Sequence, residues 1–391
     1  MTQSAAAAAA LPWQLAGPLR AAEYTSEYVR QAFGISGADD IGLLNHAAAV
    51  ERLAADRSPA AMLTRLFFLE VDETVRHVAR VFSHQQILEL TGAGVLQRLG
   101  VCVRSRVRID AVGSQYFIAD RRFRAFDAGA LRLPGGDPVY PPSSDSLLLA
   151  DAVSAPHASA VLDLCTGSGI QAVRCAAQAD QVIAVDLNQR AATLAMLNAR
   201  LNGIENVDVR LGTLYAPVRG LQFDLVLANP PFVASPYTRA PSYHAGGPTG
   251  DRVLRRIIAG WNPALRERGR AFAVSHVALR TGESLDTRAQ GWFADFAGRA
   301  VVFQLETGTA VDLAAAQALF ALQRGLAAYA SEIRRWLGYL RRHRIATVAL
   351  VVIAAERGKR GSVEVVDAQP RVLPIPLTLP VVDRVRSWFA T

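Results

Sequence analysis

The chain has 391 residues, of which 51% are hydrophobic and 19% charged, and 42 Lys and Arg against 34 Asp and Glu give it a net charge of +8. This composition excludes a disordered protein and leaves room for two or three domains, or for one large α/β unit with an accessory module. Lys359 is the only lysine, so the basic excess is almost entirely arginine. It favours anionic partners only weakly, because arginine bias also arises from genome composition.

The cysteines, the histidines and the apolar runs limit the class of protein to which the chain can belong. Cys102, Cys165 and Cys175 stand in apolar segments without CxxC spacing, which predicts reduced, buried thiols. The seven histidines show no HxxxH or His/Cys pairing, so we expect no metal site. The run at 345–355 is too short to span a bilayer, and no basic region precedes the N-terminal alanines. We therefore expect a cytoplasmic protein with no membrane segment.

The N-terminal third is predicted to be a disordered tail, residues 1–17, followed by a helical accessory domain, residues 18–130. Apolar residues recur every three or four positions in RSPAAMLTRLFFLE (57–70) and ETVRHVARVF (73–82), which predicts helices. Ser83 is the expected N-cap of a further helix.

Two alternating segments follow, VCVRSRVRID (101–110) and SQYFIADRRF (114–123), and they predict two strands around a short turn. Helices followed by one hairpin indicate a winged-helix-like module. Arg104, Arg106 and Arg108 would share one face of the first strand, because side chains alternate with period two. Such a face can meet nucleic-acid phosphates, but more often it is a solvated strand face.

Residues 131–149 are rich in Pro and Gly and predict a linker. From 150 to 391 the pattern alternates between strand and helix, which is typical of a doubly covered parallel sheet. Apolar runs predict strands at 160–165, 181–186, 206–211, 223–229, 270–276, 299–305 and 345–355, with a long helical insert at about 312–343 that ends in RRWLGYLRRHR.

A glycine loop, DLCTGSGIQA (163–172), follows the first of these strands. Gly167 and Gly169 allow the backbone to turn sharply into a helix whose free N–H groups face a ligand. Asp186 ends the second strand, where a carboxylate suits the two hydroxyls of a ribose. The spacing also fits the G-x-G-x-x-A dinucleotide fingerprint, so these features leave NAD and other nucleoside cofactors open.

Two features favour S-adenosylmethionine. Asp163, just before the loop, suits a cationic ligand group and would sit poorly beside a pyrophosphate. The second feature is Asn229-Pro230-Pro231-Phe232 after the fourth strand, which presents an amide, fixed carbonyl acceptors and an aromatic face. Asn-Pro is also common turn chemistry. Loops at the carboxyl ends of neighbouring parallel strands face one crevice, so we expect the two features to act together.

Residues 150–391, with DLCTGSG, VDLN and NPPF in that order, resemble class I S-adenosylmethionine-dependent methyltransferases of the Asn-Pro-Pro-aromatic branch. That branch includes release-factor glutamine methyltransferases, ribosomal RNA amine methyltransferases and adenine DNA methyltransferases. The resemblance implies an α/β, Rossmann-like, seven-stranded sheet with an antiparallel final strand. It implies that S-adenosylmethionine contacts Asp163, Cys165, Thr166, Gly167, Gly169, Asp186, Leu187, Thr213 and Asn229.

The stretch SYHAGGPTGD resembles the substrate-side loop of the same branch, with Gly246, Gly247 and Gly250 at its bends. The substrate contacts implied are Pro231, Phe232, Tyr243, His244, Gly246 and Gly247. Thr213 stands where many relatives have an acidic residue for the adenine amine, and Phe232 stands where tyrosine is commoner. Contact with adenine at Thr213 would therefore be made by backbone and hydroxyl groups.

We assign catalysis to Asn229, Pro230 and Phe232. The Asn229 oxygen and the Pro230 carbonyl would accept the two hydrogens of an NH₂ group, so that its lone pair faces the methyl group while Phe232 stacks on its plane. Tyr243 and His244 would close over the site or relay a proton, or only pack.

The predicted function is N-methylation of a planar nitrogen, amide or amine, in a protein, a nucleic acid or a small metabolite. The alternatives are a small-molecule methyltransferase acting on N, O or C, a winged-helix DNA-binding regulator that senses S-adenosylmethionine, and an NAD-dependent oxidoreductase. The sequence leaves the methyl acceptor and the oligomeric state open.

Overall fold

The computed structural model describes residues 15–35, 40–123, 137–153, 157–237, 246–359, 361–369, 383–385 and 387–389. The chain divides into two compact units. Unit 1 comprises Met1–Ser144, Thr166–Ala176 and Asp186–Leu211, and unit 2 comprises Asp145–Cys165, Ala177–Val185 and Gly212–Thr391. Most of the predicted tail lies outside the described residues.

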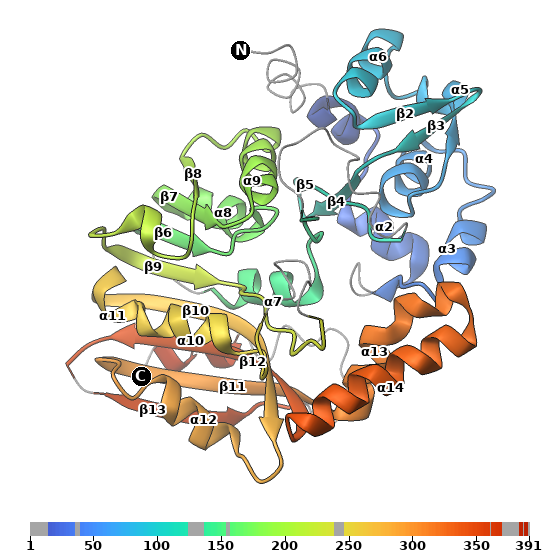
Figure 1. Cartoon of the computed structure of the whole chain (residues 1–391). Helices are drawn as coiled ribbons and strands as arrows, with labels where there is room; N and C mark the ends of the chain where they lie inside the picture. The colour runs from blue at the N-terminus through green and yellow to red at the C-terminus, as the bar shows by residue number, and fades with distance from the viewer. Residues whose placement is uncertain are drawn as a thin grey trace. The chain divides into compact units, whose positions relative to one another are not determined.

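The first half of unit 1 is mainly helical, as predicted (Figure 1). Its elements are α2 (Ser26–Phe33), α3 (His46–Arg52), α4 (Pro59–Leu63), the π-helix η2 (Thr64–Phe68), β1 (Glu73–Thr74), α5 (Val75–Val78) and α6 (His84–Gly92). The predicted N-cap of α6 is confirmed, since the Ser83 hydroxyl accepts from the Gln86 N–H at 3.2 Å and the Gln86 side chain accepts from the Ser83 N–H at 2.8 Å.

Four strands follow in unit 1: β2 (Leu96–Leu99), β3 (Cys102–Ser105), β4 (Arg108–Val112) and β5 (Gln115–Ala119). Strands β2 and β3 join β1 in an antiparallel sheet of order β1-β3-β2, and β4 and β5 form a separate hairpin. The single strand predicted at 101–110 is therefore wrong. The Ser105 hydroxyl donates to the Val107 carbonyl at 2.6 Å, and this local bond turns the chain between β3 and β4.

The predicted arginine face does not form. Arg104 makes two hydrogen bonds to the Asp72 carboxylate, at 2.8 and 2.7 Å. Arg108 lies in β4, is 1% exposed and donates to the Asp110 carboxylate and the Phe68 carbonyl. A buried guanidinium depends on such partners, so this side chain is not available to a phosphate.

Unit 1 also contains α8 (Ile170–Cys175), α9 (Gln189–Leu201) and β8 (Val207–Leu211). The apolar face of α9, including Leu194 and Leu197, joins the same hydrophobic core as Phe67 and Ile118 of the N-terminal segment. The N-terminal segment and the helix after Asp186 are therefore packed as one body.

Unit 2 holds most of the strands predicted beyond the linker. Its elements are α7 (Ser144–Ala152), β6 (Ala158–Leu164), η3 (Ala176–Gln178), β7 (Ala179–Asp186), η4 (Ala216–Val218), β9 (Phe223–Ala228), α10 (Arg252–Ala259), α11 (Trp261–Ala264), β10 (Leu265–Arg280), α12 (Leu285–Trp292), β11 (Gly298–Thr309), α13 (Ala310–Ala318), η6 (Leu319–Arg324), α14 (Leu326–Arg342), β12 (Ile345–Arg357) and β13 (Ser362–Asp367).

Seven strands of the large sheet lie in unit 2, in the order β13-β11-β12-β10-β9-β6-β7. Strands β7, β6, β9 and β10 are parallel, and β12 runs antiparallel to both β10 and β11, as the resemblance implied. With β8 of unit 1 the sheet has eight strands in place of the expected seven. The unpredicted strand is β13, whose polar, half-buried sequence SVEVVD is typical of an edge and lacks an apolar run.

The helical insert lies between β11 and β12, where α13 and α14 form a hairpin (Figure 1). The apolar side of α14, with Trp336 and Leu340, packs against Val233 and Ala234, which follow the NPPF motif. The insert therefore supports the segment that leaves β9.

Three expectations concern the chain as a whole. Among the described residues no helix is long and apolar enough to cross a membrane. The same residues contain no cluster of three or more His, Cys, Asp or Glu side chains that could hold a metal ion. Cys102, Cys165 and Cys175 are not joined in disulfides, and they are half-buried and not fully buried as predicted.

Candidate active site

The glycine loop has the backbone conformation that its sequence predicts. Gly167 and Gly169 have φ values of +56° and +84°, in the left-handed region that favours glycine. A Cβ on Gly169 would lie 2.9 Å from the Ala195 Cα on α9. Cys165 also has a positive φ, +59°, which is strained for a residue with a side chain and typical of turns at functional sites.

Asp186 and the loop are brought together within unit 1. One carboxylate oxygen accepts from the Gly167 N–H at 2.9 Å and the other from the Asn188 N–H at 2.8 Å. Burial raises the pKa of Asp186 above its ordinary value, and the backbone hydrogen bonds oppose this rise. The two oxygens offer roughly four lone-pair sites, more than the Gly167, Asn188 and Leu187 N–H groups occupy, so the carboxylate can still accept from a ligand hydroxyl. Leu187, beside it, is 64% exposed.

Asn198, which was not predicted as a site residue, holds the backbone of the glycine loop through hydrogen bonds. This α9 side chain is fully buried, and its oxygen accepts from the Ile118 N–H at 2.8 Å. Its nitrogen donates to the Ile118 carbonyl at 2.9 Å and to the Ser168 carbonyl at 2.7 Å. The β4-β5 hairpin of the accessory segment is thereby tied to the glycine loop.

We expect Asn198→Ala to lower the free energy of unfolding by about 1–3 kcal/mol, the cost of leaving buried backbone groups without partners. Urea unfolding measures the change. Met196→Ala, at an exposed position on the same helix, serves as the control and should change stability by less than about 0.5 kcal/mol. Equal losses in the two variants would contradict the role given to Asn198.

In unit 2, the predicted neighbouring strands β6 and β9 are paired in parallel. Asp163 is fully buried and lies opposite Leu227, and Leu164 lies opposite Ala228. Asn229 follows directly after Ala228, so the amide and the strand end that leads into the glycine loop are at the same edge of the sheet.

The Asn229 amide is held by the first turn of α7. Its nitrogen donates to the Asp145 carboxylate at 3.1 Å and to the Ser146 hydroxyl at 3.3 Å. Both partners lie in the segment predicted as a linker. The signal that could have found them is the run SSD directly before an apolar helix, which is an N-terminal capping pattern.

The ring of Phe232 stacks on His276 of β10, with centroids 4.7 Å apart and an interplanar angle of 18°. His276 was not predicted as a site residue. Because the imidazole covers one face of Phe232, a planar acceptor could stack only on the opposite face.

The described part of the substrate-side segment begins at Gly246, and its loop lies directly on the backbone of Phe232. A Cβ on Gly246 would be 2.6 Å from the Phe232 carbonyl carbon, and one on Gly250 would be 2.2 Å from its carbonyl oxygen. Gly247 and Gly250 have positive φ values, +85° and +80°, so the predicted bends at these two glycines are confirmed, whereas Gly246 does not have a positive φ.

Three predicted contacts have no further support in the structure. Tyr243 and His244 lie outside the described residues. Thr213 is exposed, and its carbonyl accepts from the Ala216 N–H at 3.0 Å in a turn.

Burial lowers the pKa of His276 below its ordinary value of 6.5, and the nearby carboxylates of Asp145 and Glu306 oppose this shift. The folded state therefore disfavours the imidazolium. Neutral His276 contributes stability that is fully present above about pH 6.5 and is lost as the pH falls through the lower folded pKa.

We expect the His276→Phe variant to lose less stability than the wild type between about pH 7 and about pH 5, the range in which histidine gains its proton. Chemical unfolding at both pH values measures the two slopes. His84→Gln, at an exposed position, should keep the wild-type slope. The expectation fails if His276→Phe also keeps it.

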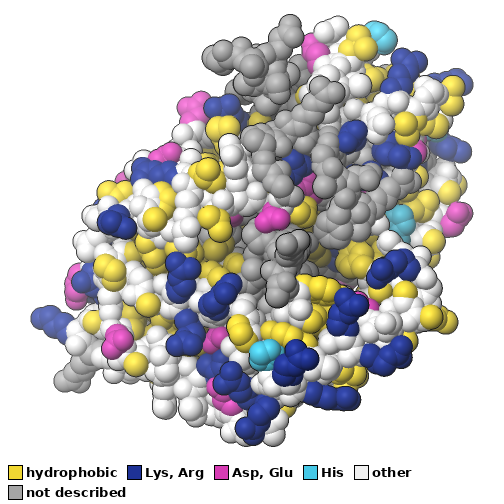
Figure 2. Space-filling model, in the orientation of Figure 1, with side chains coloured by type: hydrophobic (Ala, Val, Ile, Leu, Met, Phe, Trp, Pro, Cys, Tyr) yellow, Lys and Arg dark blue, Asp and Glu magenta, His cyan; other side chains and the backbone are white. Residues whose placement is uncertain are grey.

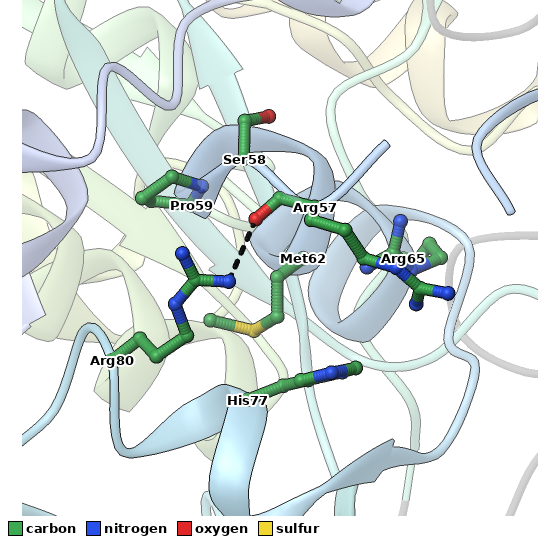
Figure 3. Close-up of a pocket in the computed structure, with 7 residues that line it drawn as sticks. All are labelled: Arg57, Ser58, Pro59, Met62, Arg65, His77 and Arg80. Carbon is green, nitrogen blue, oxygen red and sulfur yellow. Dashed lines mark hydrogen bonds between the residues drawn. The ribbon is translucent and has the colours of Figure 1, made fainter. Parts of the chain in front are cut away.

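A small surface pocket in unit 1 is lined by Arg57, Ser58, Pro59, Met62, Arg65, His77 and Arg80 (Figure 3). Arg80 donates to the Arg57 carbonyl at 3.1 Å, and Arg65 is engaged by Glu73 and by the carbonyls of Leu53 and Asp56. None of the predicted site residues lines this pocket.

Arginine side chains are spread over the face of the molecule that Figure 2 shows. On α14 the exposed ones are Arg334, Arg335, Arg341 and Arg342, which belong to the basic stretch noted in the sequence.

Comparison with known proteins agrees with this geometry. Residues 143–291 match the family model "Methyltransferase small domain", and residues 21–106 match a domain of unknown function, DUF7059. A release factor glutamine methyltransferase of Xylella fastidiosa strain Temecula1 is 30% identical over 57% of this chain and 80% of its own length. A ribosomal protein uL3 glutamine methyltransferase of Bradyrhizobium diazoefficiens is 38% identical over 25% of this chain and 34% of its own length.

Two further matches come from archaeal and bacterial proteins. A Methanocaldococcus jannaschii protein provisionally named a protein N5-glutamine methyltransferase is 34% identical over 31% of this chain, which spans 63% of that relative. The crystal structure of a class I S-adenosylmethionine-dependent methyltransferase homologue from Listeria monocytogenes superposes with a TM-score of 0.38 and 13% identity over 62% of this chain and 68% of that one. The superposition carries no functional argument.

The sheet order and the matched family model define a methyltransferase with a Rossmann-like fold. The chain belongs to the class I S-adenosylmethionine-dependent methyltransferases, in the family that includes the release factor glutamine methyltransferases. It is an enzyme whose methyl donor is S-adenosylmethionine.

Proposed function

We propose that the enzyme methylates the side-chain amide nitrogen of a glutamine in a protein. The observation that carries the proposal is the Asn229 amide at the carboxyl end of β9, beside the strand that bears Asp163. An amide and fixed carbonyls suit a planar NH₂ group, and the relatives with similar sequence are named for glutamine methylation.

S-adenosylmethionine supplies an electrophilic methyl group on a positively charged sulfur. The task of the protein is to orient the acceptor. The Asn229 oxygen and the Pro230 carbonyl accept the two amide hydrogens and stabilise the positive charge that develops on nitrogen. The face of Phe232 opposite His276 is the one that would fix the amide plane, because His276 covers the other face.

Within each unit, the residues that we propose as cofactor contacts fit the chemistry of the cofactor. The left-handed glycines 167 and 169 give close backbone approach, and Asp186 keeps lone pairs for ribose hydroxyls. Asp163 supplies a negative charge for the cationic end of the cofactor. Cys165, Thr166 and Leu187 complete this proposed set, while Thr213 is retained only as a backbone or hydroxyl contact to adenine.

The substrate contacts proposed are Pro231, Phe232, Gly246 and Gly247. The two glycines place their loop on the Phe232 backbone, so a side chain there would displace the acceptor-binding segment. The winged-helix-like character of residues 18–130 and a cytoplasmic location remain predictions.

The test is a labelling experiment with S-adenosylmethionine carrying a radioactive methyl group. The purified enzyme is incubated with release factor, ribosomal protein uL3, total RNA and a small-molecule extract from its own source. We expect label in a protein, released as methylamine on acid hydrolysis, and none when the accepting glutamine is replaced by asparagine. Label confined to RNA or small molecules would replace the glutamine assignment, and the absence of label from both proteins would contradict it.

A further inference from the structure

We propose that Asp145 and Ser146 are positioning residues that hold the Asn229 amide with its oxygen, and not its nitrogen, turned toward the methyl acceptor. The inference deepens the proposed function and rests on it. It begins from a property of asparagine, whose amide is nearly symmetric in shape but opposite in hydrogen bonding at its two ends.

The hydrogen bonds at Asn229 favour one of the two orientations of its side-chain amide. An ionised carboxylate can only accept hydrogen bonds, so Asp145, 3.1 Å from the amide nitrogen, admits Nδ2 and excludes Oδ1. Rotating the amide by half a turn would place two acceptors against each other. Ser146, 7% exposed, takes the second contact to Nδ2 at 3.3 Å, although its hydroxyl alone would tolerate either orientation.

This arrangement has two consequences for an incoming NH₂ group. Both Asn229 N–H groups are engaged by α7, so neither is left to bind the nitrogen lone pair that must attack the methyl group. The oxygen remains as the acceptor that orients the substrate hydrogens, before reaction begins. A flipped amide would present N–H groups to the substrate and block both functions.

Charge exchange between the two positions provides the test. In Asp145→Asn the amide pair can be satisfied in either orientation, so we expect kcat/KM to fall about tenfold, the effect of one net hydrogen bond. In Asn229→Asp two carboxylates face each other, and we expect a loss of at least about 10²-fold. In the double variant the new asparagine at 145 can donate to the new aspartate at 229, whose second oxygen again accepts from substrate.

The double variant is therefore expected to recover at least about tenfold over Asn229→Asp alone. Ser146→Ala should cause a smaller loss than Asp145→Asn. The assays are run at about pH 8, above the titration of neighbouring His276, so that changed charge at 145 does not act through the imidazole. Thermal unfolding and S-adenosylmethionine affinity are measured for each variant, and rescue is judged only among folded, cofactor-binding proteins.

Two results would overturn the inference: wild-type activity in Asp145→Asn, or a double variant no more active than Asn229→Asp. Neither result touches the proposed function, which is tested by the wild type. A wild type that labels no glutamine refutes the proposed function itself.

Discussion

Asn229→Ala is expected to reduce methyl transfer by at least about 10²-fold, the usual effect of removing one preorganised polar contact to a transition state. The affinity for S-adenosylmethionine should stay close to that of the wild type, because the Asn229 amide contacts mainly the substrate that accepts the methyl group. Single-turnover labelling of the acceptor protein measures the first quantity, and calorimetric titration with the cofactor measures the second.

Asn206→Ala is the matched control. Asn206 is a part-buried asparagine that donates to the Ala176 carbonyl at 2.9 Å and stands outside the predicted site. It should lose some stability and keep its rate of methyl transfer. Labelling at the wild-type level in Asn229→Ala would refute the role of Asn229 as an acceptor for the substrate hydrogens, and with it the claim that the NPPF segment selects a planar nitrogen.

Gly169→Val is expected to destabilise the protein by about 2–5 kcal/mol, which combines the strain of a left-handed backbone with that of overpacking. The added Cβ would lie 2.9 Å from the Ala195 Cα, and a helix backbone cannot move aside cheaply. Cofactor affinity should fall as well, since the glycine begins α8 at the end of the loop. Urea unfolding and cofactor titration measure the two effects.

Gly203→Val separates the two contributions. Gly203 has a similar φ of +70°, but no atom lies within 4 Å of its built Cβ. This variant should show only the backbone strain, about 1–2 kcal/mol, and should bind the cofactor normally. Equal losses in both variants would show that the contact with α9 is unimportant, and full cofactor affinity in Gly169→Val would remove the loop from the site.

The local patterns in the sequence were enough to predict most of the strands of the sheet. Buried parallel strands need continuous apolar runs, so β6, β7, β9 and β12 are visible as such, while the polar edge strand β13 is not. Left-handed turns can likewise be predicted from glycines in the sequence, because few other residues tolerate that conformation.

The partners of individual polar side chains were decided by tertiary structure alone. Asp145 meets Asn229 across 84 positions of the chain, and Asn198 meets Ile118 across 80. Arg108 looked like a solvated strand residue and is instead buried against Asp110 and Phe68. Periodicity specifies which face of an element is apolar. The hydrogen-bond partner of a polar side chain does not depend on separation in the sequence, because any complementary group that the fold brings within about 3 Å can serve.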